Sequence, residues 1–155
     1  MADIRIKVAK DKASLVKGLL ATDSTGPFQT YADVVAFAAS IGLKNGRRTP
    51  IEGETSKSEP APIHRESMSA RGHDSLIHLI AVVATNDPKI LASEENCDEK
   101  RIRLFEEYAN AGLEILGGAL RGSVNYTETL LIFLSTEREP KDAQEEEFDL
   151  SRFMS

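Results

Sequence analysis

Histidines and carboxylates are the residues of this chain that could bind a metal or transfer a proton. The three histidines are His64, His73 and His78, and their spacing matches no zinc-binding pattern. Asp74 and His78 stand one helical turn apart, so they could share a metal or a proton, but a capping and packing pair is the commoner outcome of this spacing. We therefore predict no metal site and no cofactor.

The other candidate groups do not form a catalytic pattern either. Glu106 and Glu107 are adjacent, and adjacent residues point about 100° apart on a helix, which makes a carboxylate dyad unfavourable. Cys97 is the single cysteine, and no Cys/His nucleophile pair is apparent. The sequence also contains no P-loop and no GxSxG motif. We predict that the protein is not an enzyme.

Positive charge is concentrated at the start of the chain. The net charge is -6 overall, +4 for residues 1–50 and -4 for residues 137–155. A basic segment attracts a phosphate backbone, whereas an acidic tail can bind a basic partner or compete with nucleic acid. We therefore expect contacts with DNA through the basic residues Arg5, Lys7, Lys44, Arg47 and Arg48.

The composition favours a mainly helical domain. The chain has 155 residues, of which 41% are hydrophobic and 28% charged, and it contains no Trp. Such a composition suits a core of Leu, Ile, Val and Ala. No apolar run is long enough to cross a bilayer, and the N-terminus lacks the apolar segment of a secretory signal. We expect a cytoplasmic protein with no membrane contact.

The segment from Thr30 to Lys44 has the clearest helix signals. Thr30 can cap the helix start, and Asp33 lies in the first turn, where the helix dipole favours negative charge. Val34, Phe37 and Ile41 then follow at steps of three and four residues. Such a stripe, followed by glycines, predicts a helix that ends near residue 44.

The segment from Asp3 to Val8 alternates polar and apolar residues, which predicts a short strand. A short strand needs a partner, and we expect the same segment of a second copy, and thus a homodimer or higher homo-oligomer. With helices predicted at 10–21 and 30–44, the order strand, helix, helix resembles the ribbon-helix-helix DNA-binding fold. That resemblance implies that Arg5 and Lys7 face DNA.

The remainder of the chain divides by composition. Residues 49–72 are rich in Pro, Gly, Ser and Glu, and we predict a flexible linker between a basic part, residues 1–48, and a small helical bundle, residues 73–136. Within the bundle we expect a central helix from Asp74, a long helix over 98–120 and a last helix over 128–134. Residues 137–155 are predicted to be an acidic, disordered tail.

Three stretches together resemble a known family: PFQTYADVVAFAASIGLKNGRR, SLIHLIAVVATND and RIRLFEEYANAGLEIL. They are similar to the DNA phosphorothioation-associated protein 4 family, whose members are linked to the bacterial Dnd system. That system places sulfur in the DNA backbone and uses it to distinguish self from invading DNA. The resemblance implies an accessory role in modification or restriction, and thus in defence against phage, and it supplies no catalytic residue.

Within the third stretch, the resemblance singles out a polar run as a candidate partner-binding site: Glu106, Glu107, Tyr108 and Asn110. The leading hypothesis is a non-catalytic accessory protein that binds DNA, either plain or phosphorothioated, through its basic N-terminal part and Dnd subunits through its helical part. One alternative is a pure protein-interaction module of the restriction complex. Another is a ribbon-helix-helix regulator of the operon.

Overall fold

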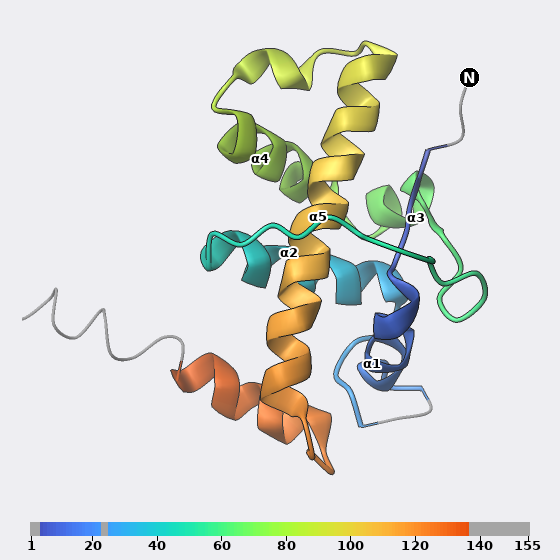
Figure 1. Cartoon of the computed structure of the whole chain (residues 1–155), viewed down its shortest axis with the longest axis vertical. Coiled ribbons are helices and arrows are strands. Elements are labelled where there is room, and N and C mark those ends of the chain that lie inside the picture. Colours follow the sequence, from blue (N-terminus) through green and yellow to red (C-terminus); the bar gives the residue numbers. More distant parts are fainter. Residues whose placement is uncertain (1–3, 23–24, 137–155) are drawn as a thin grey trace, which may run out of the picture.

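A long helix, α5 (Glu95–Leu120), forms the axis of the molecule, and the other helices pack around it (Figure 1). The structure is a computed structural model, and it describes residues 4–22 and 25–136. The predictions for the acidic tail lie outside these residues. The fold is mainly helical with a short antiparallel pair of strands, so the predicted fold class is confirmed.

Helix α2 (Tyr31–Lys44) begins and ends as its sequence predicts. The Thr30 Oγ1 accepts a hydrogen bond from the Asp33 backbone N–H at 3.2 Å, which satisfies one of the free amides of the first turn. The helix is rich in small residues, and its buried positions include Val34, Val35 and Ala38. These side chains pack against Phe105 and Leu113 of α5 in the main core.

The α2 and α5 backbones come into close contact where they cross. A Cβ placed on Gly112 of α5 would lie 1.7 Å from the carbonyl oxygen of Ala38, and one on Gly42 of α2 would lie 2.2 Å from that of Tyr108. Only glycine permits such an approach. The glycines therefore set the distance between the two helices that build the core.

The N-terminal strand pairs within its own chain, so the expectation of pairing with a second copy is wrong. Strand β1 (Arg5–Ile6) is antiparallel to β2 (Ile63–His64), with Arg5 opposite His64 and Ile6 opposite Ile63. The partner was missed because a strand of two residues has no detectable alternation. This pairing removes the reason for which self-association was expected. The helix that follows is also short: η1 (Lys10–Lys12) leads into α1 (Ala13–Gly18).

The stretch predicted as a flexible linker is packed against the rest of the chain. The backbone N–H of Thr49 donates to the carbonyl of Glu107 at 3.0 Å, and that of Ser56 donates to Val8 at 2.7 Å. Pro60 is fully buried, and so is Met68 of α3 (Arg65–Ala70). The composition of this stretch is polar, but Ile63 and Met68 are part of the main core.

Helix α4 (Asp74–Thr85) lies on the outside of the molecule rather than at the centre of a bundle. Its Ile77, Ile80 and Ala81 are buried, whereas Leu79 and Val83 are exposed. It continues through η2 (Pro88–Leu91) into α5. A last helix occupies residues 126–136. None of the helices in the described part of the chain is both long and apolar enough to cross a membrane.

Candidate functional site

The predicted DNA-binding residues lie on two segments that meet α5. Arg5 is on β1, which Lys7 follows, while Lys44 is in the last turn of α2, and Asn45 and Gly46 separate it from Arg47 and Arg48. The backbone N–H of Lys7 donates to the Glu106 Oε2 at 2.7 Å. The structure therefore brings Lys7 close to the same stretch of α5 that receives the two arginines.

Acidic side chains of α5 pair with both arginines. The Arg47 Nη2 lies 3.2 Å from the Glu114 Oε2, and the Arg48 Nε lies 3.2 Å from the Glu107 Oε1. The Lys12 Nζ also lies 3.7 Å from Glu114. Arg47 and Arg48 remain 52% and 46% exposed, and exposed pairs of this kind contribute only about 0–1 kcal/mol. The carboxylates thus offset much of the positive charge without burying it.

Glu106 is a partly buried carboxylate of α5. Burial raises its pKa, while the hydrogen bond from the Lys7 N–H and the charges of Lys7 and Arg103 oppose the rise. The side chain joins the end of β1 to the middle of α5. This contact is internal to the chain.

A second polar cluster, which the sequence analysis missed, joins α2 to the turn before α4. Arg71 donates from Nε to the Asp33 Oδ1 at 3.2 Å and from Nη2 to Oδ2 at 2.7 Å. The His73 Nε2 lies 2.9 Å from Oδ1. The Arg71 hydrogen bond lowers the pKa of Asp33 to about 2; burial opposes this, and His73 and Thr30 support it. Nearly 40 residues separate the partners, so no local pattern could reveal them.

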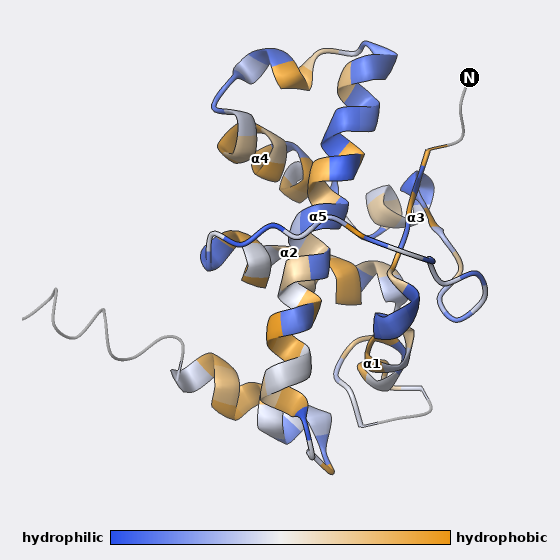
Figure 2. Cartoon of the chain, viewed as in Figure 1, coloured by the Kyte–Doolittle hydropathy of each residue, from blue (hydrophilic) through white to orange (hydrophobic). Residues whose placement is uncertain are grey.

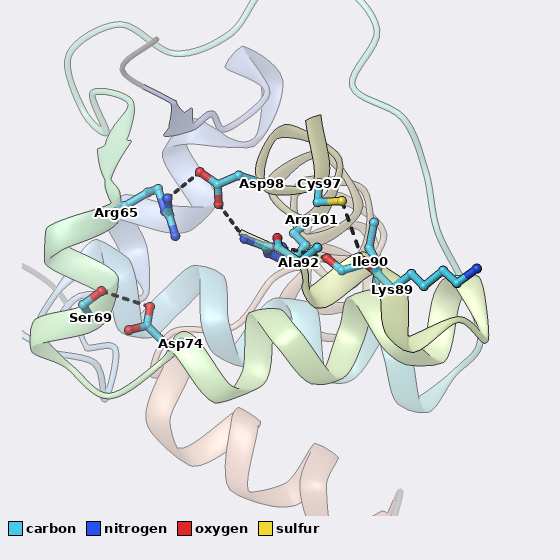
Figure 3. A network of polar contacts seen from close by, with 9 residues as sticks. All are labelled: Arg65, Ser69, Asp74, Lys89, Ile90, Ala92, Cys97, Asp98 and Arg101. Carbon is cyan, nitrogen blue, oxygen red and sulfur yellow. Dashed lines mark hydrogen bonds and ion pairs between the residues drawn. The ribbon is translucent and has the colours of Figure 1, made fainter. Parts of the chain in front are cut away.

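A third cluster connects α3, η2 and the start of α5 (Figure 3). The buried Arg101 donates from Nη1 to the carbonyls of Ile90, at 2.6 Å, and Ala92, at 2.9 Å. Its Nη2 lies 3.1 Å from Asp98, whose other oxygen pairs with Arg65. The role of Arg101 could not be inferred from the sequence, because a single sequence does not reveal that the carbonyls of Ile90 and Ala92 need a donor.

The groups first considered for chemistry include two residues of α4, Asp74 in its first turn and His78 one turn later. Asp74 accepts a hydrogen bond from Ser69 at 2.9 Å, whereas His78 is exposed on α4. The Cys97 thiol donates weakly to the carbonyl of Lys89 at 3.7 Å (Figure 3). Within residues 4–22 and 25–136, no group of three or more His, Cys, Asp or Glu side chains is placed to hold a metal ion.

In the part of the chain that the structure describes, α4 and the last helix each expose a pair of large apolar side chains. On the outer side of α4, Leu79 is 53% and Val83 54% exposed, and we call these two residues the α4 apolar face. In the last helix, residues 126–136, Leu131 and Ile132 are exposed as well. Figure 2 shows both helices as largely hydrophobic ribbons. Large apolar side chains that gather on one helix face commonly mark an interaction surface.

Comparison with known proteins identifies the family. A family model described as DNA sulphur modification system-associated protein 4 matches residues 5–153. The chain belongs to this family. The resemblance inferred from the sequence is therefore confirmed, and the chain is an associated protein of the DNA sulphur modification system. No match was found among curated proteins or among solved structures.

In this DNA sulphur modification system-associated protein, the run that carries the resemblance contacts the chain itself. The Asn110 Nδ2 donates to the carbonyl of Thr49 at 3.0 Å, and only 4% of Asn110 is exposed. Glu107 pairs with Arg48, and Tyr108 packs beside the core. The predicted partner-binding residues thus hold neighbouring segments onto α5. Whether they also contact a partner stays a prediction.

Proposed function

We propose that this member of the DNA sulphur modification system-associated protein 4 family is a non-catalytic accessory protein that docks onto another subunit of the system through the α4 apolar face. The observation that carries the proposal is the exposure of Leu79 and Val83, each more than half accessible. Burying apolar area of this kind yields about 25 cal/mol per Å². The face therefore offers binding energy that the isolated chain does not use.

The chemistry of α4 indicates the kind of partner. Residues 75–86 contain no Asp, Glu, Lys or Arg, although 28% of the whole chain is charged. Its inner side is already covered, because Ile77, Ile80 and Ala81 are buried. Interface centres are depleted in charged residues. We infer that the partner presents an uncharged, apolar helix or groove.

Co-purification tests this proposal. The chain should recover a subunit of the sulphur modification system from nuclease-treated extracts, and the double variant Leu79→Glu, Val83→Glu should lose it, because two buried carboxylates oppose docking. The matched control is Leu131→Glu, Ile132→Glu, which places the same charges on the other uncovered apolar surface. Recovery of the same subunit by the α4 variant would reject the proposal.

DNA contact is the second candidate function, and the half-exposed guanidinium groups of Arg47 and Arg48 favour it. Replacing Arg5, Lys7, Arg47 and Arg48 by Ala should then weaken binding to plain or phosphorothioated duplex in a gel shift. Conversely, Glu107→Gln with Glu114→Gln should tighten binding, since these carboxylates compete with phosphate for the two arginines. Unchanged affinity at low salt for both variants would reject a role for this surface.

A further inference from the structure

We propose that the protein binds a small carboxylate with an apolar body in a cavity between α2 and α3. The cavity has a volume of about 460 Å³, within the usual range for small-molecule sites. Its walls are the first turn of α2, the outer side of α3 and the segment 58–64 that leads into β2. No part of the proposed docking function uses this cavity.

The walls favour an apolar ligand body. Five of the eleven lining residues have side chains with no polar atom: Ala32, Ala61, Pro62, Ile63 and Ala70. Tyr31 adds an aromatic ring, and Ser58, Ser67 and Thr30 add hydroxyl groups. Ligand sites typically combine such an apolar lining with a few polar groups that fix the orientation of the ligand.

Arg71 is the group that would bind the carboxylate. Its Nε and Nη2 are held by Asp33, which fixes the plane of the guanidinium and leaves Nη1 outside this pair. The side chain lines the cavity and is 41% exposed. A guanidinium held in this way loses little freedom on binding, and its fork geometry suits a carboxylate.

The charges around the cavity also favour an anionic head group. Among the described residues that line it, none is Asp or Glu, and His64 is the second basic group. The positive end of the α2 dipole lies in the same wall. Because Asp33 offsets the charge of Arg71, recognition rests on hydrogen bonds more than on net charge. We therefore expect a dissociation constant on the order of 1 mM for a ligand of about ten heavy atoms.

Amide NMR spectra of the full chain test this inference with phenylacetate and its neutral analogue phenylacetamide. Phenylacetate should shift signals of residues 30–32, 58–64 and 67–71, and should bind at least roughly 10-fold more tightly than the amide. The proposal would be overturned if no shifts appear at a phenylacetate concentration about ten times the expected dissociation constant. It would also be overturned if the shifts are confined to other residues or if the amide binds equally well.

Two variants separate the cavity from the head group. Ser67→Phe fills the cavity and should abolish binding of both compounds, whereas Ser93→Phe makes the same change at an exposed position that does not line it and should leave binding intact. Arg71→Gln should still bind phenylacetamide, and the ratio of the two dissociation constants should fall to about 1. Binding by the Ser67 variant, or an unchanged preference in the Arg71 variant, would contradict the assignment.

Discussion

Single polar side chains join segments of this protein that are distant in sequence. Asp33 connects α2 to Arg71 and His73, and Arg101 connects α5 to the carbonyls of η2. Each of these groups has its partners in place, and a buried polar group that loses its partner costs more than the pair contributes when intact. Removing one member of such a cluster should therefore have a measurable cost.

Asp33→Asn should lower the free energy of unfolding by about 1 kcal/mol at pH 7, less than its full pKa shift implies because Arg71 is partly exposed to solvent. The folded pKa of Asp33 lies below its ordinary value of 3.8, so this stability is present above about pH 4 and is lost as the pH falls towards about 2. Urea unfolding at several pH values measures the difference in the free energy of unfolding between the parent and the variant. The control is Asp11→Asn, at a largely exposed site; an equal loss in both variants at pH 7 would contradict the account.

Arg101→Ala should lower the free energy of unfolding by about 3 kcal/mol, because it leaves two carbonyls and the Asp98 Oδ1 without the donor that Arg101 provides. Denaturant unfolding measures this value. Arg103→Ala, on the exposed side of the same helix, should stay within about 0.5 kcal/mol of the parent. Equal effects of the two substitutions would show that the η2 contacts contribute nothing.

Local polar contacts were predictable from the sequence, and distant ones were not. The Thr30 cap was predicted because its acceptor and donor are three residues apart. The Asp33 and Arg101 clusters depend on how α3, α4 and η2 pack, and that packing is not encoded in any short window. The pairing of Arg47 with Glu114 and of Arg48 with Glu107 could not be predicted either, because it depends on the fold.

At the scale of elements, the α2–α5 crossing determines the core. Gly112→Ala should destabilise the protein by roughly 2–4 kcal/mol, because its Cβ would meet the Ala38 carbonyl and the helices would have to separate. Gly118→Ala is the matched control: it lies in the same helix with no atom within 4 Å of the added Cβ, and it should stabilise by about 0.5–1 kcal/mol. Thermal unfolding of the two variants compares these opposite signs, and a tolerated Gly112→Ala would contradict the close crossing.

Helices were predicted well because apolar periodicity is a local signal. Both α2 and α5 lie close to their predicted positions. Periodicity does not show which apolar side of a helix is covered by another element. Helix α4 is apolar on nearly all sides, and it was therefore predicted to be the central helix of the bundle. The hydrophobic pattern of α4 predicts that Leu79 and Val83 are buried, but the structure exposes both. We infer from this difference that they belong to an interface.

At the scale of the whole molecule, the charge asymmetry of the sequence is reduced by folding. Lys12, Arg47 and Arg48 meet Glu107 and Glu114 of α5, so the basic N-terminal part and an acidic helix side neutralise one another. Large apolar side chains of α4 and of the last helix, by contrast, stay exposed in the described part of the chain. This balance favours a protein partner over a nucleic acid.

Amide hydrogen exchange of the chain, alone and in complex with the subunit it recovers, tests the central claim most directly. Docking through the α4 apolar face predicts slower exchange across residues 74–91 in the complex, with residues 44–48 unchanged. Slower exchange at residues 5–8 and 44–48, with residues 74–91 unchanged, would contradict the account and assign binding to the basic segments.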